Sequence, residues 1–370
     1  MHTLPHTIFP DERCHEHGII DTLPCPWPEC RNGVEEDQFQ VLSLMEGEPP
    51  DIYTRRRWVA TSGTPYFSWD NNRFPNWFSA PKTFWNEARR NHLVRTKTPD
   101  LIYHYTSLDG FVGIVESGTI WLSDYAYLND TRELAHGAEL VLDVIEEITK
   151  TETAEGVLGL LQTWGKDIQQ STHRICVASF SADGDSLSQW RSYGPVAVGF
   201  EPRNLSLHAY RAHLGPVEYD RERQRSLVST YLNHLCQAYA VDMEASRLDR
   251  IPDVYHKVDR LLELIAFFKD PAFLVENEYR LAYIEYPSLI EAFEIAPTPK
   301  HFRTTRTRLL PYAAANELAP TLSNQPPLKL SQVILGPDSD MLLERGIREF
   351  LATKQLSDVE VKRSIVPYRT

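Results

Sequence analysis

The sequence has few cysteines and no long apolar segment. Five of its 370 residues are cysteine, a small and odd number that excludes a disulfide-built scaffold. No run approaches the roughly 18 consecutive apolar residues of a membrane-spanning helix. Glycine is sparse at 17 residues, and the sequence holds neither a Gly-x-Gly-x-x-Gly motif nor a P-loop. A disulfide-rich secreted domain, a helical membrane protein and the common nucleotide-binding loops are therefore not expected.

Positive charge is also in deficit over the chain as a whole. Lys and Arg number 38 against 51 Asp and Glu, and the net charge of −13 argues against a protein that coats nucleic acid along its whole surface. The first ten residues lack the charged start and apolar core of a secretory signal, so we expect a cytoplasmic protein without a membrane segment. With 42% hydrophobic residues the chain can bury a sizeable core.

Three stretches of the chain differ in amino-acid composition. Residues 1–50 are rich in Cys, His and Pro. They predict a small module with little core, which needs a bound metal or a cross-link to be stable. Residues 51–98 are basic and aromatic, with Arg55, Arg56 and Arg57 next to Trp58. This segment is either a linker or strap, or a place where single-stranded nucleic acid binds. Residues 99–370 have the pattern of an ordinary globular domain.

The N-terminal module carries a candidate zinc site. The ligands would be Cys14 and His17 from one pair, and Cys25 and Cys30 from a second pair whose prolines favour a tight turn. Zinc takes four nitrogen or sulfur ligands in a tetrahedron, and two closely spaced pairs supply them. Four protein ligands leave no open position, so the predicted role is structural. His15 is an alternative to His17, and free surface thiols are the alternative to a metal.

The large domain is predicted to be α+β, because strands and helices are interspersed without regular βαβ alternation. Ser107 is expected to cap a helix over 108–116 that Gly118 ends. Periodicity predicts further helices over 132–150, 254–268 and 340–353. Strands are expected at 101–105, 120–122, 174–180, 196–200, 279–285, 332–335 and 359–364.

Three blocks in this domain stand out. They run from Leu101 through His104 to Glu133, from Ser179 through Trp190 to Phe200, and from Phe268 through Glu276-x-Glu278 to Arg280. Together with Val333 to Pro337 and Val366 to Arg369, they resemble the bacterial domain of unknown function 2971 over residues 99–370. That resemblance implies no activity.

A second and weaker resemblance implies a chemistry. The strand with His104 and the helix after it, Ser179-x-Ser181 after a strand, and Glu276-x-Glu278 entering a strand are similar to elements of ADP-ribosyltransferases of the His-Tyr-Glu type. The implied fold is an ADP-ribosyltransferase-like mixed sheet core with flanking helices. The implied activity is NAD-dependent transfer to a macromolecule, either protein or nucleic acid, or hydrolysis of NAD, in a toxin or an anti-phage defence effector.

The resemblance also implies residue roles. Cleavage of the nicotinamide–ribose bond passes through an oxocarbenium-like state that a carboxylate stabilises, and Glu278 is the candidate. His104 would hydrogen-bond a ribose hydroxyl of NAD, and Tyr193 would stack on nicotinamide. Arg191 or Arg280 would meet the pyrophosphate. The remaining candidates for NAD binding are Tyr105, Thr106, Ser181 and Glu276.

Other interpretations stay open from the residues alone. His104 also fits a strand residue bonded to backbone. Glu276 and Glu278, two apart, would share one face of a strand and also fit ion pairs with Arg280 or Arg191. The chain would then be a non-catalytic sensor or adaptor whose zinc module and basic aromatic segment bind nucleic acid, with a degenerate large domain. A metal-dependent nuclease would use Asp183, Asp185, Glu276 and Glu278, but the usual Glu-x-Lys pattern is missing.

Overall fold

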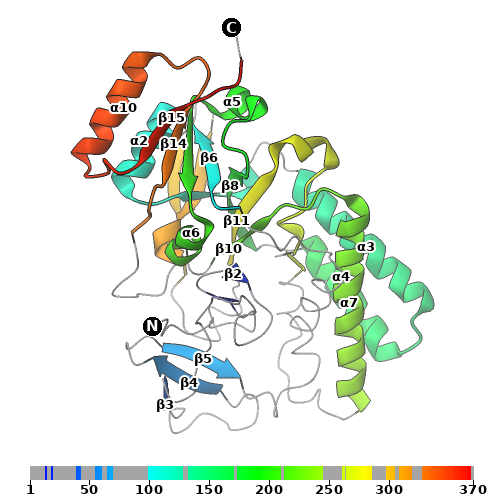
Figure 1. The fold of residues 1–370 in the computed structure, drawn as a ribbon. Helices are drawn as coiled ribbons and strands as arrows, with labels where there is room; N and C mark the ends of the chain where they lie inside the picture. Colours follow the sequence, from blue (N-terminus) through cyan, green and yellow to red (C-terminus); the bar gives the residue numbers. More distant parts are fainter. Residues whose placement is uncertain are drawn as a thin grey trace.

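A computed structural model describes the chain in part, including most of the large domain. The residues described are 13–14, 18–19, 39–42, 55–60, 65–69, 99–127, 132–170, 173–209, 212–244, 261–262, 264–285, 297–304, 308–318 and 327–367. Near the N-terminus, β1 (Arg13–Cys14) pairs with β2 (Gly18–Ile19), both drawn in blue in Figure 1. The strands β3 (Phe39–Leu42), β4 (Arg55–Ala60) and β5 (Pro65–Trp69) form a separate antiparallel sheet.

The large domain is built on one ten-stranded mixed sheet. Its strands are β6 (Ile102–Thr106), β7 (Trp121–Asp124), β8 (Arg174–Ser181), β9 (Val196–Phe200), β10 (His213–Pro216), β11 (Glu278–Glu285), β12 (His301–Thr304), β13 (Leu309–Ala314), β14 (Gln332–Leu335) and β15 (Glu360–Arg363). All the pairs are antiparallel except β14 with β15.

The sheet branches at β8. One edge of β8 pairs with β11 over its whole length, and β11 pairs in turn with β10. The other edge pairs with two different strands. Near its start β8 pairs with β7, which leads to β13 and β12. At its end β8 pairs with β6, which leads to β9, β14 and β15.

Capping residues near in sequence begin and end several of the helices. They are α2 (Leu108–Ser117), α3 (Arg132–Thr151), α4 (Glu155–Gln170), α5 (Leu187–Tyr193), α6 (Pro202–His208), α7 (Arg221–Glu244) and α10 (Met341–Thr353), with the 3-10 turns η3 (Tyr125–Tyr127), η5 (Pro271–Glu276) and η6 (Ala315–Leu318). The Ser107 hydroxyl accepts from the Gly110 amide and begins α2, and Gly118 ends it in the left-handed conformation. Asp340 caps α10 in the same way.

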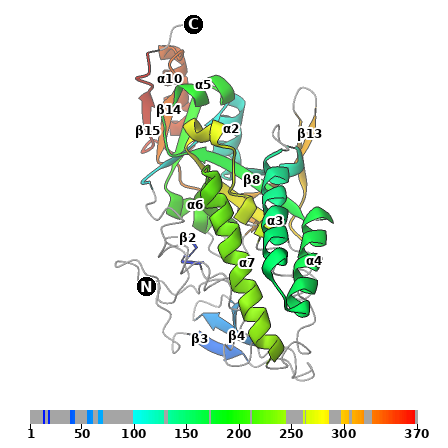
Figure 2. The same cartoon turned by 90° about the vertical axis from the view of Figure 1, so that its right-hand side faces the viewer.

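Helices cover the two faces of the sheet unequally. On one face, α3, α4 and α7 pack on the first half of β8 and the second half of β11 through Val177 and Ala282, and Figure 2 shows them side by side. Farther along the same face, α5 packs Trp190 against Tyr105 of β6 and Ala197 of β9. Polar residues of β8 and β11 therefore lie between two apolar patches on this face.

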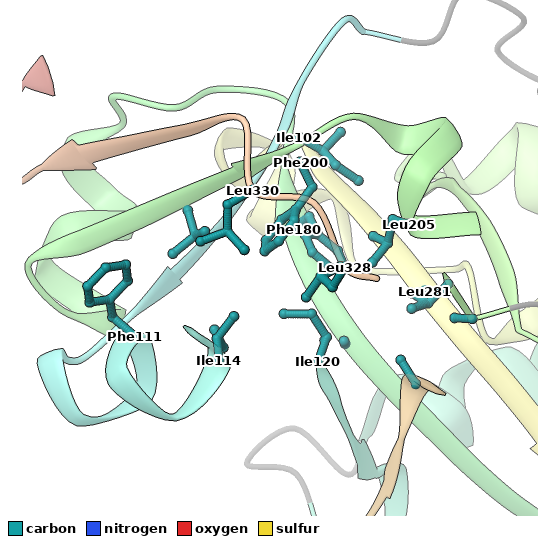
Figure 3. Packing of buried hydrophobic residues seen from close by; sticks show 14 of the residues in the cluster. Ile102, Phe111, Ile114, Ile120, Phe180, Phe200, Leu205, Leu281, Leu328 and Leu330 are labelled. Atoms are coloured by element: carbon teal, nitrogen blue, oxygen red, sulfur yellow. The ribbon is translucent and has the colours of Figure 1, made fainter. Parts of the chain in front are cut away.

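The opposite face carries the second large core. Figure 3 shows Phe111 and Ile114 of α2, Phe180 of β8 and Phe200 of β9 in this cluster. Around the branch of the sheet, Ile102 and Phe200 of this cluster are inaccessible to solvent. Burial of this size supplies most of the free energy that holds the branches in place.

The predicted α+β class agrees with this large open sheet and its helices. The strands at 174–180, 196–200 and 332–335 and the helices at 108–116 and 340–353 are confirmed to within a residue or two. The helix predicted at 254–268 lies mostly outside the described residues. No helix in the described part of the chain is both long and apolar enough to cross a membrane.

Candidate functional site

The branch leaves a split in the sheet along one edge of β8. Val177 is the last residue that pairs with β7, and Ser181 is the residue that pairs with β6. The three residues between them, 178–180, have no strand partner on that edge within the described chain. Ser179 is exposed, although residues 175–178 and 180–181 of the same strand are buried. A strand interior that opens to solvent at one serine is a place where a ligand can reach the backbone.

His104 lies at this split. Its Nδ1 donates to the carbonyl oxygen of Ser179 at 2.9 Å, since a carbonyl only accepts. The ring also packs at a tilt against Phe180, with centroids 5.6 Å apart. Burial lowers the pKa of His104, and the charge of Arg303 lowers it further against the raising effect of the Ser179 bond. At neutral pH the ring is uncharged, and Nε2 carries a lone pair that can accept from a hydroxyl.

Glu278 lies on the other side of Ser179, at the start of β11. Its backbone is paired with Ser181 of β8. The side chain is 2% exposed and forms ion pairs with Lys269 Nζ at 2.9 Å and Arg280 Nε at 2.9 Å. Its amide donates to the Tyr219 hydroxyl at 2.9 Å.

The surroundings of Glu278 lower the pKa of its carboxyl. Burial raises the pKa of its carboxyl, but the charges of Arg280 and Lys269 and the hydrogen bonds from Arg280 and Ser179 outweigh burial and lower the pKa to about 2. Burial also raises the pKa of the neighbouring Tyr219 to about 12. The carboxylate is thus ionised at every physiological pH.

Glu276 reaches the same cluster from a different element. We expected Glu276 and Glu278 on one face of a strand, and this was wrong for Glu276. It ends the 3-10 turn η5, and Asn277 then reverses the chain in the left-handed conformation. Both carboxylates nevertheless converge on Lys269, whose Nζ lies 2.6 Å from Glu276 Oε2.

Ser181, Tyr105 and Thr106 hold the surrounding backbone. The Ser181 hydroxyl donates to the Glu276 carbonyl at 2.7 Å and accepts from the Asp183 amide. The Tyr105 hydroxyl donates to the Asp183 carbonyl at 2.8 Å and accepts from the Ser186 amide. Thr106 ends β6 against Gly194, where a Cβ would lie 2.6 Å from the Thr106 carbonyl oxygen. These contacts fix the loop after β8 beside the split.

The helix α5 carries the other two candidates. It packs against both β6 and η5, so it borders the strand of His104 and the turn of Glu276. Tyr193, at its last turn, is 50% exposed, and Arg191 is exposed as well. The indole of Trp190 donates to Asp185 Oδ1 at 2.8 Å and is buried, so it serves packing. Tyr193 is therefore the ring of this helix that a ligand can reach.

Arg280, the second candidate for a pyrophosphate contact, is committed elsewhere. Its guanidinium binds both oxygens of Glu278 and the carbonyl of Ala266, and it lies over the ring of Tyr125. It is 2% exposed. Arg191 is the better placed of the two arginines for an anion from solvent.

The acidic residues of the nuclease alternative do not form a metal centre in the described chain, where no group of three potential ligands is close enough to share an ion. Asp183 accepts from the Asp185 amide within a turn, and Asp185 binds the C-terminal segment at Ser364 and Ile365. The zinc ligands Cys14, His17, Cys25 and Cys30 lie outside the residues whose side chains are described. Of the others, Cys176 and Cys236 are buried thiols whose pKa burial raises to about 12.

Sequence reasoning missed Lys269 and Arg303. Lys269 stands in the third block, seven residues before Glu276, and a lysine near two acids is a signal that was available. Arg303 lies on β12, far from the other site residues in the sequence, and only the strand order brings it near His104.

Comparisons of the chain with models of protein families, with curated proteins and with solved structures found no match. The resemblances described above therefore stay predictions.

Proposed function

We propose that this chain is an ADP-ribosyltransferase-like enzyme that consumes NAD, either to modify a macromolecule or to hydrolyse NAD, in a toxin or anti-phage defence role. The observation that carries the proposal is the adjacency of the strands that hold His104, Ser179 and Glu278. The three elements of the resemblance come from distant parts of the sequence, yet they lie on the adjacent strands β6, β8 and β11. The Ser179 carbonyl accepts from His104, and Glu278 begins the strand on the other edge of β8.

The chemistry fits these positions. When the nicotinamide–ribose bond breaks, its electron pair goes to the nicotinamide nitrogen, and positive charge develops on the ribose. A carboxylate ionised at all physiological pH values stabilises that charge without a protonation step. The acceptor atom, or water, then bonds to the ribose carbon and loses its proton to solvent.

The other groups have positioning roles in this proposal. Neutral His104 accepts from a ribose hydroxyl through Nε2, while its Nδ1 bond to Ser179 fixes the ring. Tyr193 stacks on nicotinamide from α5, and Arg191 on the same helix meets the pyrophosphate. The backbone held by Ser181, Tyr105 and Thr106 sets the distance between α5 and β11.

A non-catalytic nucleic-acid-binding protein is the second candidate, and one observation favours it. The Glu278 carboxylate is 2% exposed and is compensated by two buried cations, as in an ion cluster that serves only to hold η5 against β11. In such a protein the same residues would be present without any turnover.

The test is incubation of the purified full chain with NAD labelled in the adenylate part, in the presence of cell extract. We expect free nicotinamide to be released, with the label appearing on protein or nucleic acid, or as free ADP-ribose. If protein that is folded, as its melting curve shows, releases no nicotinamide and gives no labelled product, the enzyme proposal is wrong and the second candidate remains.

A further inference from the structure

Arg303 reaches from β12 toward the split in the sheet. Its side chain passes over β13, the strand between β12 and β7, and its Nη2 donates to the hydroxyl of Ser123 on β7 at 2.8 Å. Ser123 is paired with Val177 of β8, the last residue before the stretch 178–180 that has no partner on this edge. The guanidinium therefore lies beside the split, on the face of the sheet that Ser123 and Ser179 share.

Two hydrogen-bond donors in this pair have no acceptor among the described residues. Arg303 Nε is buried and has no hydrogen-bond partner. The Ser123 hydroxyl accepts from Arg303, so its own proton is left to donate, and no residue of the described chain accepts it. Ser123 is 7% exposed, and Arg303 is half-buried. A buried donor without an acceptor is unfavourable, so two of them side by side favour a ligand that accepts from both.

The charge of Arg303 is not compensated by a carboxylate within the part of the chain that the structure describes. Burial lowers the pKa of its guanidinium, and the acidic group that acts against burial is the phenol of Tyr312. Glu317, in the turn η6 after β13, is an acid of the same region. Its carboxylate is bonded to His301 Nε2 at 2.6 Å and pairs with that residue instead.

Asp124 is also accounted for. It follows Ser123 on β7 and points to the opposite face of the sheet, and its carboxylate accepts from the Ala126 amide at 3.1 Å. Arg174 on β8 shows the usual arrangement for a buried arginine, because its guanidinium lies 3.5 Å from the carboxylate of Glu285. A half-buried guanidinium without such a partner is disfavoured until an anion pairs with it.

A third donor points into the same opening. In an antiparallel strand the N–H and C=O of one residue point to the same edge. The Ser179 carbonyl accepts from His104 at the split, so the Ser179 amide is directed there as well. Three donors from β12, β7 and β8 thus approach one region from different directions. A phosphate, with its three acceptor oxygens, matches such a set better than a planar carboxylate does.

We propose that Arg303 and Ser123 bind a phosphate group of a small-molecule ligand that lies in the split. The guanidinium supplies the charge, and the Ser123 hydroxyl and Ser179 amide orient the group. His104 is close enough for the charge of Arg303 to lower the pKa of its ring. The bound phosphate therefore lies near the imidazole that would accept from a ribose hydroxyl. Assignment of this phosphate to NAD rests on the proposed function, whereas phosphate binding itself does not.

The experiment is a calorimetric titration of the full chain in phosphate-free buffer with adenosine, AMP, ADP-ribose and NAD. The test variants are Arg303→Met, which keeps much of the apolar stem and removes the donors, and Ser123→Ala. The control is Arg345→Met, which removes an exposed arginine from α10. Melting temperatures without ligand are measured for the same proteins and for Arg174→Met.

We expect the phosphate-bearing probes to bind the parent at least tenfold more tightly than adenosine does. Arg303→Met should weaken their binding by about tenfold or more, Ser123→Ala by roughly threefold, and Arg345→Met should leave it unchanged. Without ligand, Arg303→Met should not lower the melting temperature, because it removes a cation that has no acid. Arg174→Met should lower it, because Glu285 is left without its partner.

The probes also separate the two sources of the phosphate. NAD or ADP-ribose binding more tightly than AMP supports the pyrophosphate of NAD, and AMP binding as tightly as NAD supports a phosphomonoester. Both results keep the inference, and neither depends on NAD turnover. Equal affinity for adenosine and AMP, or unchanged affinity in Arg303→Met, would overturn it. So would a loss of melting temperature in Arg303→Met as large as in Arg174→Met, because Arg303 would then serve the fold.

Discussion

His104 donates from its imidazole to the Ser179 carbonyl of β8, and Glu278 begins the strand that pairs with the other edge of β8. The two residues belong to strands that are separated by β8 and by most of the domain in sequence. Ser179, between these two strands, is the one exposed position in the second half of β8. The consequences of this relationship concern stability, pH and turnover.

The first prediction concerns the ion cluster. Glu278→Gln should lower the free energy of unfolding by roughly 3–5 kcal/mol, because Arg280 is left buried without its acid. Glu278→Gln with Arg280→Met removes both charges and should recover most of that loss. Denaturant melts of the three proteins check this. If the single variant is as stable as the parent, the cluster is not buried in solution.

This cost is expected whether or not Glu278 is catalytic, so stability alone does not separate the two candidate functions. Glu276→Gln is the matched control, since it also removes a carboxylate from Lys269 but leaves the Glu278–Arg280 pair intact. It should cost less, because Glu276 is more exposed than Glu278.

The second prediction concerns acid. The folded pKa of Glu278 is about 2, below its ordinary value of 4.5. A depressed pKa contributes stability that is complete above 4.5 and is lost as the pH falls from about 4.5 to 2. The contribution is on the order of 3 kcal/mol. Melting curves from pH 6 to pH 2.5 should therefore fall more steeply for the parent than for Glu278→Gln. Parallel curves would contradict the lowered pKa.

The third prediction concerns the turn after α5. Gly194 has φ of 132°, and a Cβ there would lie 2.6 Å from the Thr106 carbonyl oxygen. Gly194→Ala should destabilise the domain by about 1–3 kcal/mol or more, because backbone atoms on both sides must move. Gly113→Ala on α2, where nothing lies within 4 Å, should instead stabilise it by about 0.5–1 kcal/mol. Thermal melting of both variants tests this. If Gly194→Ala does not lower the melting temperature, the backbone around Thr106 moves aside at little cost.

The fourth prediction concerns zinc. The spacing of Cys14, His17, Cys25 and Cys30 predicts about one zinc ion per chain. Elemental analysis of the purified protein should find it, and Cys25→Ser with Cys30→Ser should abolish it. Cys176→Ser is the control, because this thiol is buried in the large domain and should leave the metal content unchanged. Protein that contains no zinc would remove the metal from the account.

Much of the fold was predictable from local signals. The Ser107 cap, the left-handed Gly118 and the apolar runs at 174–180 and 332–335 mark their elements directly. Strand order was not predictable, because the pairing of β8 with β6, β7 and β11 depends on contacts between residues far apart in sequence. The helices over 155–170 and 221–244 were missed, although the first carries buried Leu161 and Trp164 at helical spacing.

The candidate site was predictable in its residues but not in their partners. His104 and Glu278 were found from short motifs, while the roles of Lys269 and Arg303 required the packing of η5 and β12 around them. Glu276 and Glu278 are not equivalent for a local reason. Glu276 ends the turn η5, Asn277 takes a left-handed conformation, and the strand begins only at Glu278. A motif of two acids does not reveal such a turn.

The central claim is that Glu278 stabilises positive charge on the ribose of NAD. Its most direct test is NAD turnover per folded molecule in the parent, in Glu278→Gln and in the charge-balanced Glu278→Gln with Arg280→Met, each measured well below its melting temperature. The account predicts that both variants lose roughly 100-fold or more in rate, and that the regained stability of the double variant does not restore it. His104→Ala should weaken NAD binding as well as rate, with the parent rate showing no His104 titration above pH 6.5. Turnover in the parent that is unchanged in folded Glu278→Gln would contradict the claim.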